Sequence, residues 1–411
     1  MEAVAEPPAG RFRSLEALKS RDFRLLWAGQ TLSLIGDGAF LVALGWKTFS
    51  LTGDTGALAL VLMAHGLAML ATLLIGGALA DRHERRRLMI LSDLARFGVI
   101  GALALTDAFG GLSFALLVVF AVGFGLGDGF FYPAFGGMVP LVVEQRHIAS
   151  ANTLISISRQ ASFVVGPALA GAVYGFAGSA SVFGFDALTF AVAAAMLLRA
   201  RPRPFEPEPR EGTFREILTG FRYVASEPWL WVSIAAASFI LMIAMAPYQA
   251  LLPAFVEDEL GGDVGTYSLL FTFQAGGMVI GTLAFGQTNP RSRRMIVMCA
   301  AFMANDLCVV VMALLGRYEA ALALVVLRGV FIGYGIGVWN TLMMELVPES
   351  KLARVISLDF FGSFGLVPVG YALAAVASGA FSSATILVAG FSLAAFLWVA
   401  PLAWRPFRTA A

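Results

Sequence analysis

The sequence predicts an all-α membrane protein in which twelve transmembrane helices form two six-helix bundles. The chain is 59% hydrophobic and only 13% charged, with a mean hydropathy of +0.81, whereas about a quarter of the residues of a soluble domain are charged. A bilayer core of about 30 Å takes roughly 20 apolar helical residues per crossing, and runs of that length follow one another along the whole chain. Backbone polar groups must be satisfied inside lipid, and a barrel would show short alternating segments instead, so these runs are predicted to be helices.

Each predicted span is a continuous apolar run bounded by polar residues. In chain order the spans cover residues 23–48, 55–80, 88–106, 112–138, 148–176, 180–199, 229–255, 266–287, 295–315, 320–346, 354–380 and 383–404.

The longest polar interruption, residues 200–228, divides the chain into halves. It opens with alternating prolines that stiffen the backbone and continues from Phe214 to Val224 with a pattern that suits an amphipathic helix at the lipid headgroups. We therefore predict an N-terminal bundle over residues 23–199 and a C-terminal bundle over residues 229–404, with cytoplasmic segments at 1–22, 200–228 and 405–411.

Basic residues are concentrated on one side of the predicted membrane. Most of the 28 Lys and Arg residues precede the first span, lie in the even-numbered loops or follow the last span, while the opposite loops carry acids such as Asp54, Asp107 and Asp263. By the positive-inside rule both termini are cytoplasmic. The protein is predicted to be a multi-pass protein of the cell inner (plasma) membrane.

The two halves share a pattern of glycines that indicates an internal repeat. Gly125, Gly127, Gly129 and the pair Val139-Pro140 recur at one constant offset, at the positions Gly333, Gly335, Gly337 and Val347-Pro348. Glycines that merely let helices pack closely explain each residue but not the shared spacing. Repeated halves favour a binding site at the midplane, between two bundles that rock about it.

Several chemistries are excluded by the motifs they need. The three lysines follow Leu18, Trp46 and Ser350, so the chain has no Gly-Lys-Ser/Thr phosphate loop. Its three scattered histidines and two intramembrane cysteines lack metal-ligand spacing. We expect no catalytic residues, no metal, no cofactor and no nucleic-acid partner, and a protein that is not an enzyme.

A charged stretch from Gly77 to Leu88, with the sequence GALADRHERRRL, separates the second and third spans. It resembles the loop 2–3 signature of the major facilitator superfamily, and Glu84 stands where the family has Gly. The residues in register with the signature are Asp81, Arg82, Arg85, Arg86 and Leu88.

Two further elements resemble exporters of this superfamily. Gly166-Pro167-Ala168-Leu169-Ala170-Gly171 in the fifth span is similar to their Gly-Pro-x-x-Gly-Gly element, although Gly-Pro can also be a simple kink. The Arg-x-x-x-Gly-x-Gly pattern of drug exporters is missing from the fourth span, where Phe120 takes the place of the arginine, but Arg328 occupies the corresponding position of the tenth span. The chain looks most like the third drug:proton antiporter family, which includes macrolide, tetracycline and siderophore exporters.

Ionisable residues inside the spans are functional candidates because burying them in lipid is costly. From the helical rise, Asp37 and Arg159 lie near the midplane and form a possible pair, and Asp128 lies nearer the basic side; the three are predicted to share a cavity wall. A carboxyl group that gains and loses a cationic partner between conformations can load and release a proton. The alternatives are a structural ion pair for the two acids and, for Arg159, binding of an anionic group of the substrate.

Other intramembrane polar residues favour structural roles. Asp93 and Arg96 have the i, i+3 spacing of an intrahelical pair, and His65 can be a packing histidine or a proton relay. Asp186 is ambiguous.

The remaining candidates lie in or beside the glycine-rich spans. Arg328 can line the cavity or pair with Asp306 on the preceding span. Tyr132 and Trp339 suit an apolar substrate-binding surface, although aromatic residues of membrane proteins mostly face lipid or the protein core.

The superfamily resemblance implies a conformational gate at the loop signature. Asp81 would dock against the positive N-terminal end of the eleventh span, near Lys351, Arg354 and Asp359, with Arg82, Arg85 and Arg86 completing the gate. Such contacts bias the equilibrium toward the outward-open state. The alternative is a charge cluster that only fixes topology.

These residues and resemblances predict a secondary active transporter, with proton-coupled efflux of drug-like or amphipathic small molecules by alternating access and a role in antibiotic resistance. Its partners are the substrate, protons and the lipid bilayer, and the chain is expected to work as a monomer. The alternatives are a siderophore or other metabolite exporter, a lysophospholipid flippase, a nutrient symporter, or a non-transporting scaffold or sensor.

Overall fold

The computed structural model describes residues 13–80, 82–204, 213–288, 290 and 292–408. Every regular element in this part of the chain is a helix, and eleven helices are long and apolar enough to cross a membrane. The first bundle consists of α1 (Arg21–Thr52), α2 (Ala57–Ala80), α3 (Arg85–Ala108), α4 (Phe114–Val142) and α5 (Ile148–Arg199), with the short helices η1 (Arg13–Lys19) and η2 (Gln145–His147).

Helix α1 has a defined signal at each end. The Ser20 side chain accepts a hydrogen bond from the Phe23 amide at its start, and Gly53 ends it in the left-handed conformation, with φ of 61°. These are the usual N-cap and C-cap solutions for the unpaired backbone groups at a helix terminus. The sequence-predicted start and end, residues 23 and 48, are therefore each a few residues inside the helix.

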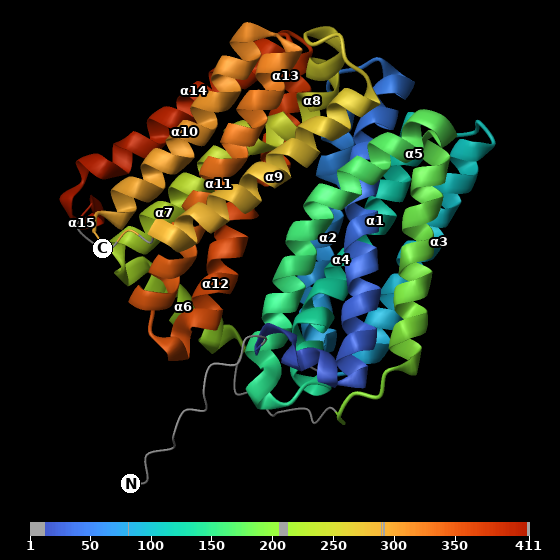
Figure 1. Cartoon of the computed structure of the whole chain (residues 1–411), viewed down its shortest axis with the longest axis vertical. Helices are drawn as coiled ribbons and strands as arrows, with labels where there is room; N and C mark the ends of the chain where they lie inside the picture. The colour runs from blue at the N-terminus through green and yellow to red at the C-terminus, as the bar shows by residue number, and fades with distance from the viewer. Residues whose placement is uncertain (1–12, 81, 205–212, 289, 291, 409–411) are drawn as a thin grey trace.

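Helix α5 contains two antiparallel segments joined at Gly178. A single straight helix of 52 residues would be about 78 Å long, far more than a bilayer needs. Gly178 is non-helical, with φ of 74°, and the ribbon reverses there (Figure 1). Residues near both ends of α5 consequently lie beside the start of the first bundle: Ser150 accepts from the Ala17 amide, and the Arg201 amide donates to Asp22. The reversal falls in the gap between the predicted fifth and sixth spans.

The second bundle contains two helices with interruptions. α7 (Pro228–Ile240), the π-helical η3 (Leu241–Met245) and α8 (Ala246–Asp258) form one continuous rod, and α12 (Glu349–Phe364) and α13 (Val367–Ser378) are separated at Gly365-Leu366, just before Pro368. The other elements are α9 (Val264–Thr288), α10 (Arg294–Leu315), α11 (Tyr318–Leu346), α14 (Ser383–Val399), η4 (Ala400–Ala403) and α15 (Arg405–Arg408), and α6 (Thr213–Ser226) precedes the bundle and packs on α7 and α12.

The repeated glycines make equivalent contacts in the two halves. A Cβ on Gly125 would lie 2.3 Å from the His65 carbonyl oxygen on α2, and a Cβ on Gly333 would lie 2.2 Å from the Met278 carbonyl oxygen on α9. Both positions therefore allow a close helix crossing that a side chain would prevent. The predicted repeat is reflected in the packing of α4 on α2 and of α11 on α9.

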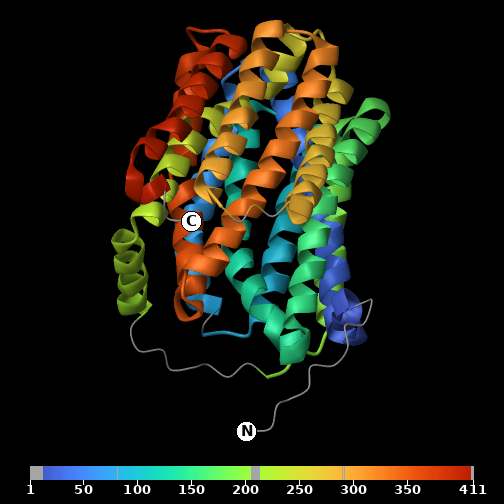
Figure 2. The ribbon, with the colours of Figure 1, turned by 60° about the vertical axis from the view of Figure 1, so that its left-hand side comes forward.

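We call the end of the molecule that carries Arg82–Arg87, Arg199–Arg203 and Arg293–Arg294 the basic face, and the other end the opposite face. The bundles converge toward the opposite face and diverge toward the basic face (Figures 1 and 2). α13, on the opposite-face side of its break, packs against α2, whereas α12, on the basic-face side, packs against α6 and α7 of its own half. This structure is therefore closed at the opposite face.

Candidate functional site

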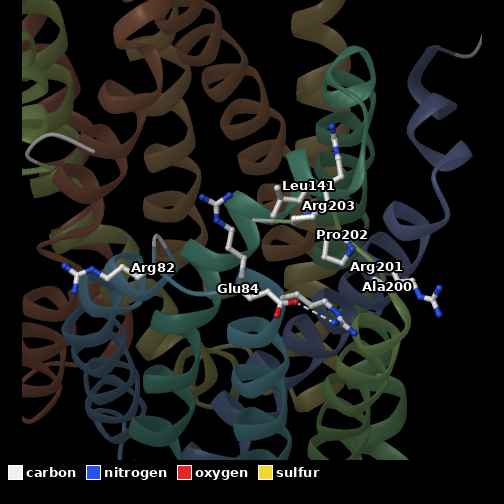
Figure 3. Close-up of a pocket in the computed structure, with 10 residues that line it drawn as sticks. Arg82, Glu84, Leu141, Ala200, Arg201, Pro202 and Arg203 are labelled. Atoms are coloured by element: carbon white, nitrogen blue, oxygen red, sulfur yellow. Dashed lines mark ion pairs between the residues drawn. The ribbon is translucent and has the colours of Figure 1, made fainter. Parts of the chain in front are cut away.

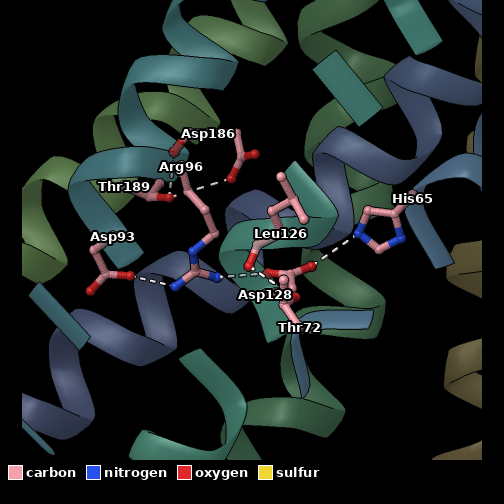
Figure 4. Close-up of polar contacts among 8 residues, drawn as sticks. All are labelled: His65, Thr72, Asp93, Arg96, Leu126, Asp128, Asp186 and Thr189. Atoms are coloured by element: carbon pink, nitrogen blue, oxygen red, sulfur yellow. Dashed lines mark hydrogen bonds and ion pairs between the residues drawn. The ribbon is translucent and has the colours of Figure 1, made fainter. Parts of the chain in front are cut away.

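A buried guanidinium on α3 is the centre of the polar cluster inside the first bundle. Arg96 is 2% exposed. It forms an ion pair with Asp93 one turn earlier on α3 and a second with Asp128 on α4, Nη1 to Oδ1, at 3.2 Å (Figure 4). The predicted intrahelical pair is confirmed in its geometry, but it is part of a larger cluster.

The walls around this guanidinium are aromatic. The Arg96 guanidinium carbon lies 4.0 Å from the centre of the Phe131 ring and 4.4 Å from that of Phe190. Gly127 makes the space, because a Cβ there would lie 2.7 Å from Arg96 Cγ. At the repeat-related Gly335 the same space is filled by the ring of Phe302. The two halves share the glycine position, but the space beside it holds a buried arginine in the N-terminal half and an aromatic ring in the C-terminal half.

Asp128 links α2, α3 and α4. Its Oδ2 lies 3.0 Å from Nε2 of His65, and its Oδ1 faces Arg96 (Figure 4). The imidazole side chain is 26% exposed and that of Asp128 is 8% exposed. The histidine therefore stands between the buried carboxylate and more accessible space.

Two further carboxylates approach the cluster along α1. Asp37 interacts electrostatically with Arg96 and Asp128. Asp186, on the second segment of α5, is fully buried, and a Cβ on Gly36 would lie 2.3 Å from its Oδ1. The absence of a side chain at Gly36 thus lets Asp186 lie against α1, beside Asp37.

Three of these carboxylates each have one oxygen that is buried and unpaired. Among the described residues, Oδ1 of Asp37, Oδ2 of Asp93 and Oδ2 of Asp186 have no hydrogen-bond partner. A buried polar atom without a partner costs roughly 1–3 kcal/mol, and more when it is charged. One guanidinium balances one carboxylate, so the four acids need further positive charge or protons to be stable inside a membrane.

The cluster lies well inside the helices. Measured along the helices from the basic face at 1.5 Å per residue, Asp37, Asp128 and Asp186 are each about 20–24 Å in. Asp128 is thus level with the other two, deeper than the sequence predicts, because α4 continues to Val142 instead of ending at residue 138.

The predicted pairing of Asp37 with Arg159 is wrong for this structure. The Arg159 side chain is exposed and makes no ion pair with a described residue, whereas Asp37 interacts with Arg96. Arg159 instead interacts electrostatically with Tyr132, which is 43% exposed and in range of Asp37 and Asp128. Arg159 and Tyr132 therefore lie at the accessible margin of the cluster.

Arg328 is the centre of a second, separate polar group in the C-terminal half. Its Nε donates to Asn305 at 3.1 Å and its Nη1 donates to Gln274, while its guanidinium stacks on Tyr248 at 4.0 Å. The predicted partner Asp306 makes no direct ion pair with Arg328 and instead accepts from Asn305 at 2.8 Å. An amide side chain thus stands between the two charged groups.

Trp339 and Asp359, predicted as a substrate-surface and a gate residue, contact each other. The indole N–H donates to Asp359 Oδ2 at 3.0 Å, and Ser363 donates to Oδ1 at 3.2 Å. Both residues belong to the second bundle, on α11 and α12. In this structure Asp359 is therefore held within its own bundle.

The loop signature binds the ends of its own bundle. Arg85 donates to the Gly137 carbonyl at 2.7 Å, and Arg86 donates to those of Leu197 and Leu198 at 2.8 and 2.7 Å. The loop lies beside the segment that follows α5, which carries Arg201 and Arg203 (Figure 3). Asp81 lies outside the described residues, Arg82 is exposed, and Lys351 at the start of α12 lies over the Tyr223 ring at 4.3 Å. The gate between loop and α12 stays a prediction for another conformation.

Glu84 fits the position where the superfamily signature has glycine. Its φ is −59°, which any residue adopts, so no glycine is needed there. It forms ion pairs with Arg87 at 2.7 Å and Arg86 at 3.7 Å. The additional carboxylate thus holds the side chains of Arg86 and Arg87 beside it.

The exporter-like element of α5 is a packing surface. A Cβ on Gly166 would lie 2.8 Å from Gly38 Cα on α1, and one on Gly171 would lie 2.7 Å from Ser268 Cβ on α9. Pro167 follows Gly166 on the same buried face. The element therefore joins α5 both to its own bundle and to the other bundle.

Removal of the central guanidinium will destabilise the first bundle. Breaking one side of a buried ion pair costs about 3–5 kcal/mol, and Arg96→Met leaves Asp93 and Asp128 without their cation. We expect the thermal midpoint of the purified protein to fall by several degrees. The exposed Arg146→Met serves as control and should leave the midpoint unchanged; an unshifted midpoint for Arg96→Met would contradict the central position of this residue.

Within the described ranges, no group of three or more His, Cys, Asp or Glu residues has an arrangement that could hold a metal ion.

Comparison with known proteins identifies relatives of this chain. A family model described as "Transmembrane secretion effector" matches residues 13–406. The chain is 24% identical to macrolide efflux protein A of Streptococcus pyogenes over 366 residues, covering 86% of this chain and 88% of that protein. It is 26% identical to the enterobactin exporter EntS of Shigella boydii serotype 18 over 394 residues, covering 92% and 93%.

A solved structure supports the same fold. The crystal structure of a bacterial homologue of the iron transporter ferroportin in the inward-facing state matches with a TM-score of 0.72 at 17% identity, over 92% of this chain and 98% of that chain. The protein is a multi-pass membrane transporter and not an enzyme. With the family model matched over nearly its whole length, the chain belongs to the transmembrane secretion effector family of the major facilitator superfamily.

Proposed function

We propose that this protein is a proton-coupled exporter of drug-like or amphipathic organic molecules, working by alternating access in the cell inner membrane. The observation that carries the proposal is the excess of carboxylates around Arg96, with three buried oxygens that lack a described partner. Such groups inside a membrane are expensive and mark ion or proton pathways. The relatedness to macrolide efflux protein A supports export as the direction and an organic molecule as the cargo.

We further propose a topology of twelve crossings with both termini in the cytoplasm. With α5 taken as two segments joined at Gly178, the eleven apolar helices make twelve crossings, and the concentration of arginines at one face favours a cytoplasmic location for both termini. Residues 23–199 and 229–404 then act as two rocking bundles joined by the cytoplasmic linker 200–228. We propose the monomer as the working unit.

In the proposed cycle, Asp37 takes up a proton while it faces away from Arg96 and releases it when the two approach. Asp128 couples the protonation of the cluster to His65, which is its more exposed ion-pair partner. Arg159, Tyr132, Arg328 and Trp339 provide cavity-wall contacts for the cargo. Since Arg159 is exposed at mid-depth without an ion pair among the described residues, it requires water or an anionic ligand rather than lipid.

Proton coupling is tested in inverted vesicles. We expect the wild-type protein to accumulate a macrolide only while the vesicle interior is acidic, and accumulation to collapse when the gradient is dissipated. Accumulation that persists without any proton gradient would refute the coupling. A nutrient symporter or a lysophospholipid flippase predicts a different direction or cargo in the same vesicles, and a non-transporting scaffold predicts no accumulation at all.

A second candidate, export of an anionic siderophore-like metabolite, is favoured by one observation. The Arg159 guanidinium, which makes no ion pair with a described residue, can bind an anionic oxygen of such a cargo, and the enterobactin exporter EntS is a relative over nearly the whole chain. Arg159→Gln should then abolish transport of an anionic cargo and spare a cationic macrolide. Equal loss of both cargoes would exclude a cargo-selective role for Arg159.

A further inference from the structure

Asp186 is a buried carboxyl group of the first bundle to which the proposed cycle gives no part. It lies on the second segment of α5 and is fully buried. Its Oδ1 lies 3.4 Å from the Thr189 hydroxyl (Figure 4), but that hydroxyl donates at 2.7 Å to the backbone carbonyl of Asp186 itself. Its Oδ2 has no hydrogen-bond partner among the described residues. An ionised carboxylate with so few donors around it is costly inside a membrane.

Gly36 brings this carboxyl group close to Asp37. A Cβ on Gly36 would lie 2.3 Å from Asp186 Oδ1 and 2.7 Å from Thr189 Oγ1, so α5 reaches the backbone of α1 at this point. Consecutive Cα atoms are about 3.8 Å apart, which puts the Asp186 carboxyl group within about 8 Å of the Asp37 Cα. Asp37 is also the charged residue that interacts most strongly with Asp186. The two acids, from α1 and α5, therefore form a pair.

Arg96 does not neutralise this pair. The other charged residues that act on Asp186 are Arg96 on α3 and Asp128 on α4. The terminal nitrogens of Arg96 contact Asp93 and Asp128, and its Nε has no hydrogen-bond partner among the described residues. Oδ1 of Asp37 is likewise buried without one. Arg96 thus attracts both acids at longer range but forms a hydrogen bond with neither, and the repulsion between them is relieved when one carries a proton.

The two acids differ in their access to water. Asp37 is partly exposed, whereas Asp186 is fully buried. Two carboxyl groups that interact closely titrate as a pair, and ionisation costs most at the group that is shielded from water. We propose that Asp186 is a second proton-carrying residue, which forms a carboxyl pair with Asp37 and holds the proton of that pair in the state described here.

The pair gives the proton a defined route. Loading adds one proton from water to the Asp37 carboxylate; its transfer then forms the O–H bond of Asp186 and leaves Asp37 ionised. Release reverses these steps when Arg96 approaches Asp37. The use of this proton in transport rests on the proposed function, but its presence on Asp186 does not.

The test is infrared spectroscopy of the purified full-length protein at neutral pH. A protonated carboxyl group gives a C=O stretching band apart from the amide bands, and the band shifts in D₂O. Asp186→Asn keeps the shape of the side chain and should remove the intensity of one protonated carboxyl group from the spectrum. Asp258→Asn removes an exposed acid at the end of α8 and should leave the band unchanged.

Two further variants test the pairing itself. Asp37→Asn should shift the frequency of the Asp186 band without removing it, because the neighbour changes and the proton holder stays. Gly36→Ala should also shift it, because the added Cβ displaces Asp186 from α1. Gly184→Ala is the matched control on the same segment of α5, since a Cβ there meets nothing within 4 Å. Full band intensity in Asp186→Asn would overturn the proposal, as would a band that neither Asp37→Asn nor Gly36→Ala shifts.

A transport measurement separates this inference from the proposed function. In inverted vesicles, Asp186→Asn should lose proton-driven accumulation of a macrolide and keep exchange of labelled for unlabelled macrolide. If the wild-type protein itself accumulates nothing under a proton gradient, the proposed function fails, while the infrared result still decides the protonation of Asp186. If the wild type and Asp186→Asn accumulate the macrolide equally, Asp186 does not carry the coupled proton.

Discussion

Asp37→Asn should abolish proton-driven accumulation of cargo, reducing it to the level of vesicles without the protein. The substitution preserves shape and removes the ability to carry a charge or exchange a proton at an atom that is buried without a described partner. Exchange of labelled for unlabelled cargo, which needs no net proton movement, should continue. The measurement is uptake in inverted vesicles with an imposed proton gradient, paired with a counterflow assay in the same preparation.

Two controls separate this result from misfolding or a general loss of charge. Asp258→Asn removes an exposed acid at the end of α8 and should transport normally. Asp128→Asn, which removes the carboxylate that joins His65 to Arg96, should resemble Asp37→Asn. If Asp37→Asn still accumulates cargo against a gradient, or loses exchange and accumulation together while remaining folded, Asp37 is not the proton site.

Gly171→Leu should drive the two bundles apart at the opposite face. A Cβ at this position would lie 2.7 Å from both Cβ and Oγ of Ser268 on α9, which is 2% exposed. Overpacking of this kind costs about 1–3 kcal/mol, and that penalty changes a two-state equilibrium by about 5- to 150-fold. The population should move away from the conformation described here.

Gly175→Leu is the matched control, because it lies one turn further along α5 and a Cβ there meets nothing within 4 Å. Accessibility of a single cysteine at Tyr267, on the α9 side of the contact and 1% exposed, reports the opening. Modification by a membrane-impermeant maleimide from outside should be fast in Gly171→Leu and slow in Gly175→Leu. Equal rates in the two variants would show that the Gly171 contact does not close this face.

The sequence predicts the helices well because length and apolarity are properties of each segment alone. The break between residues 176 and 180 matches the reversal at Gly178, and the repeated glycines identify the helix crossings at Gly125 and Gly333. The predicted helix ends differ from the observed ends by several residues where a capping residue determines the end, as at Gly53. The extension of α4 to Val142 also explains why the predicted depth of Asp128 is too shallow.

The polar cluster is only partly predictable. Asp37 and Asp128 stand out as charges in apolar runs, but helical rise gives depth and not the direction in which a side chain points. Arg96 fits an intrahelical pair with Asp93, and nothing local indicates that Gly127 opens space for it against α4. Its partner Asp128 becomes evident only from the packing of α3 on α4. Arg159 has a similar depth to Asp37 along its helix, but its side chain is exposed and Asp37 interacts with Arg96 instead.

The contacts of the loop signature could not be predicted from the sequence for a different reason. The contact with the eleventh span that the resemblance implies stays a prediction for another conformation. In the state described here, Arg85 and Arg86 bind helix ends of their own bundle, and Asp359 is held by Trp339 and Ser363.

Alternating access is tested most directly by distances at both faces of one protein. Spin labels at Arg146 and Ser292 report across the basic face, and labels at Phe109 and Arg317 report across the opposite face, after replacement of Cys299 and Cys308 by serine. On addition of cargo under a proton gradient, double electron–electron resonance should show the basic-face distance shortening while the opposite-face distance lengthens. Distances that stay fixed, or that change in the same direction at both faces, would contradict two bundles rocking about a shared site.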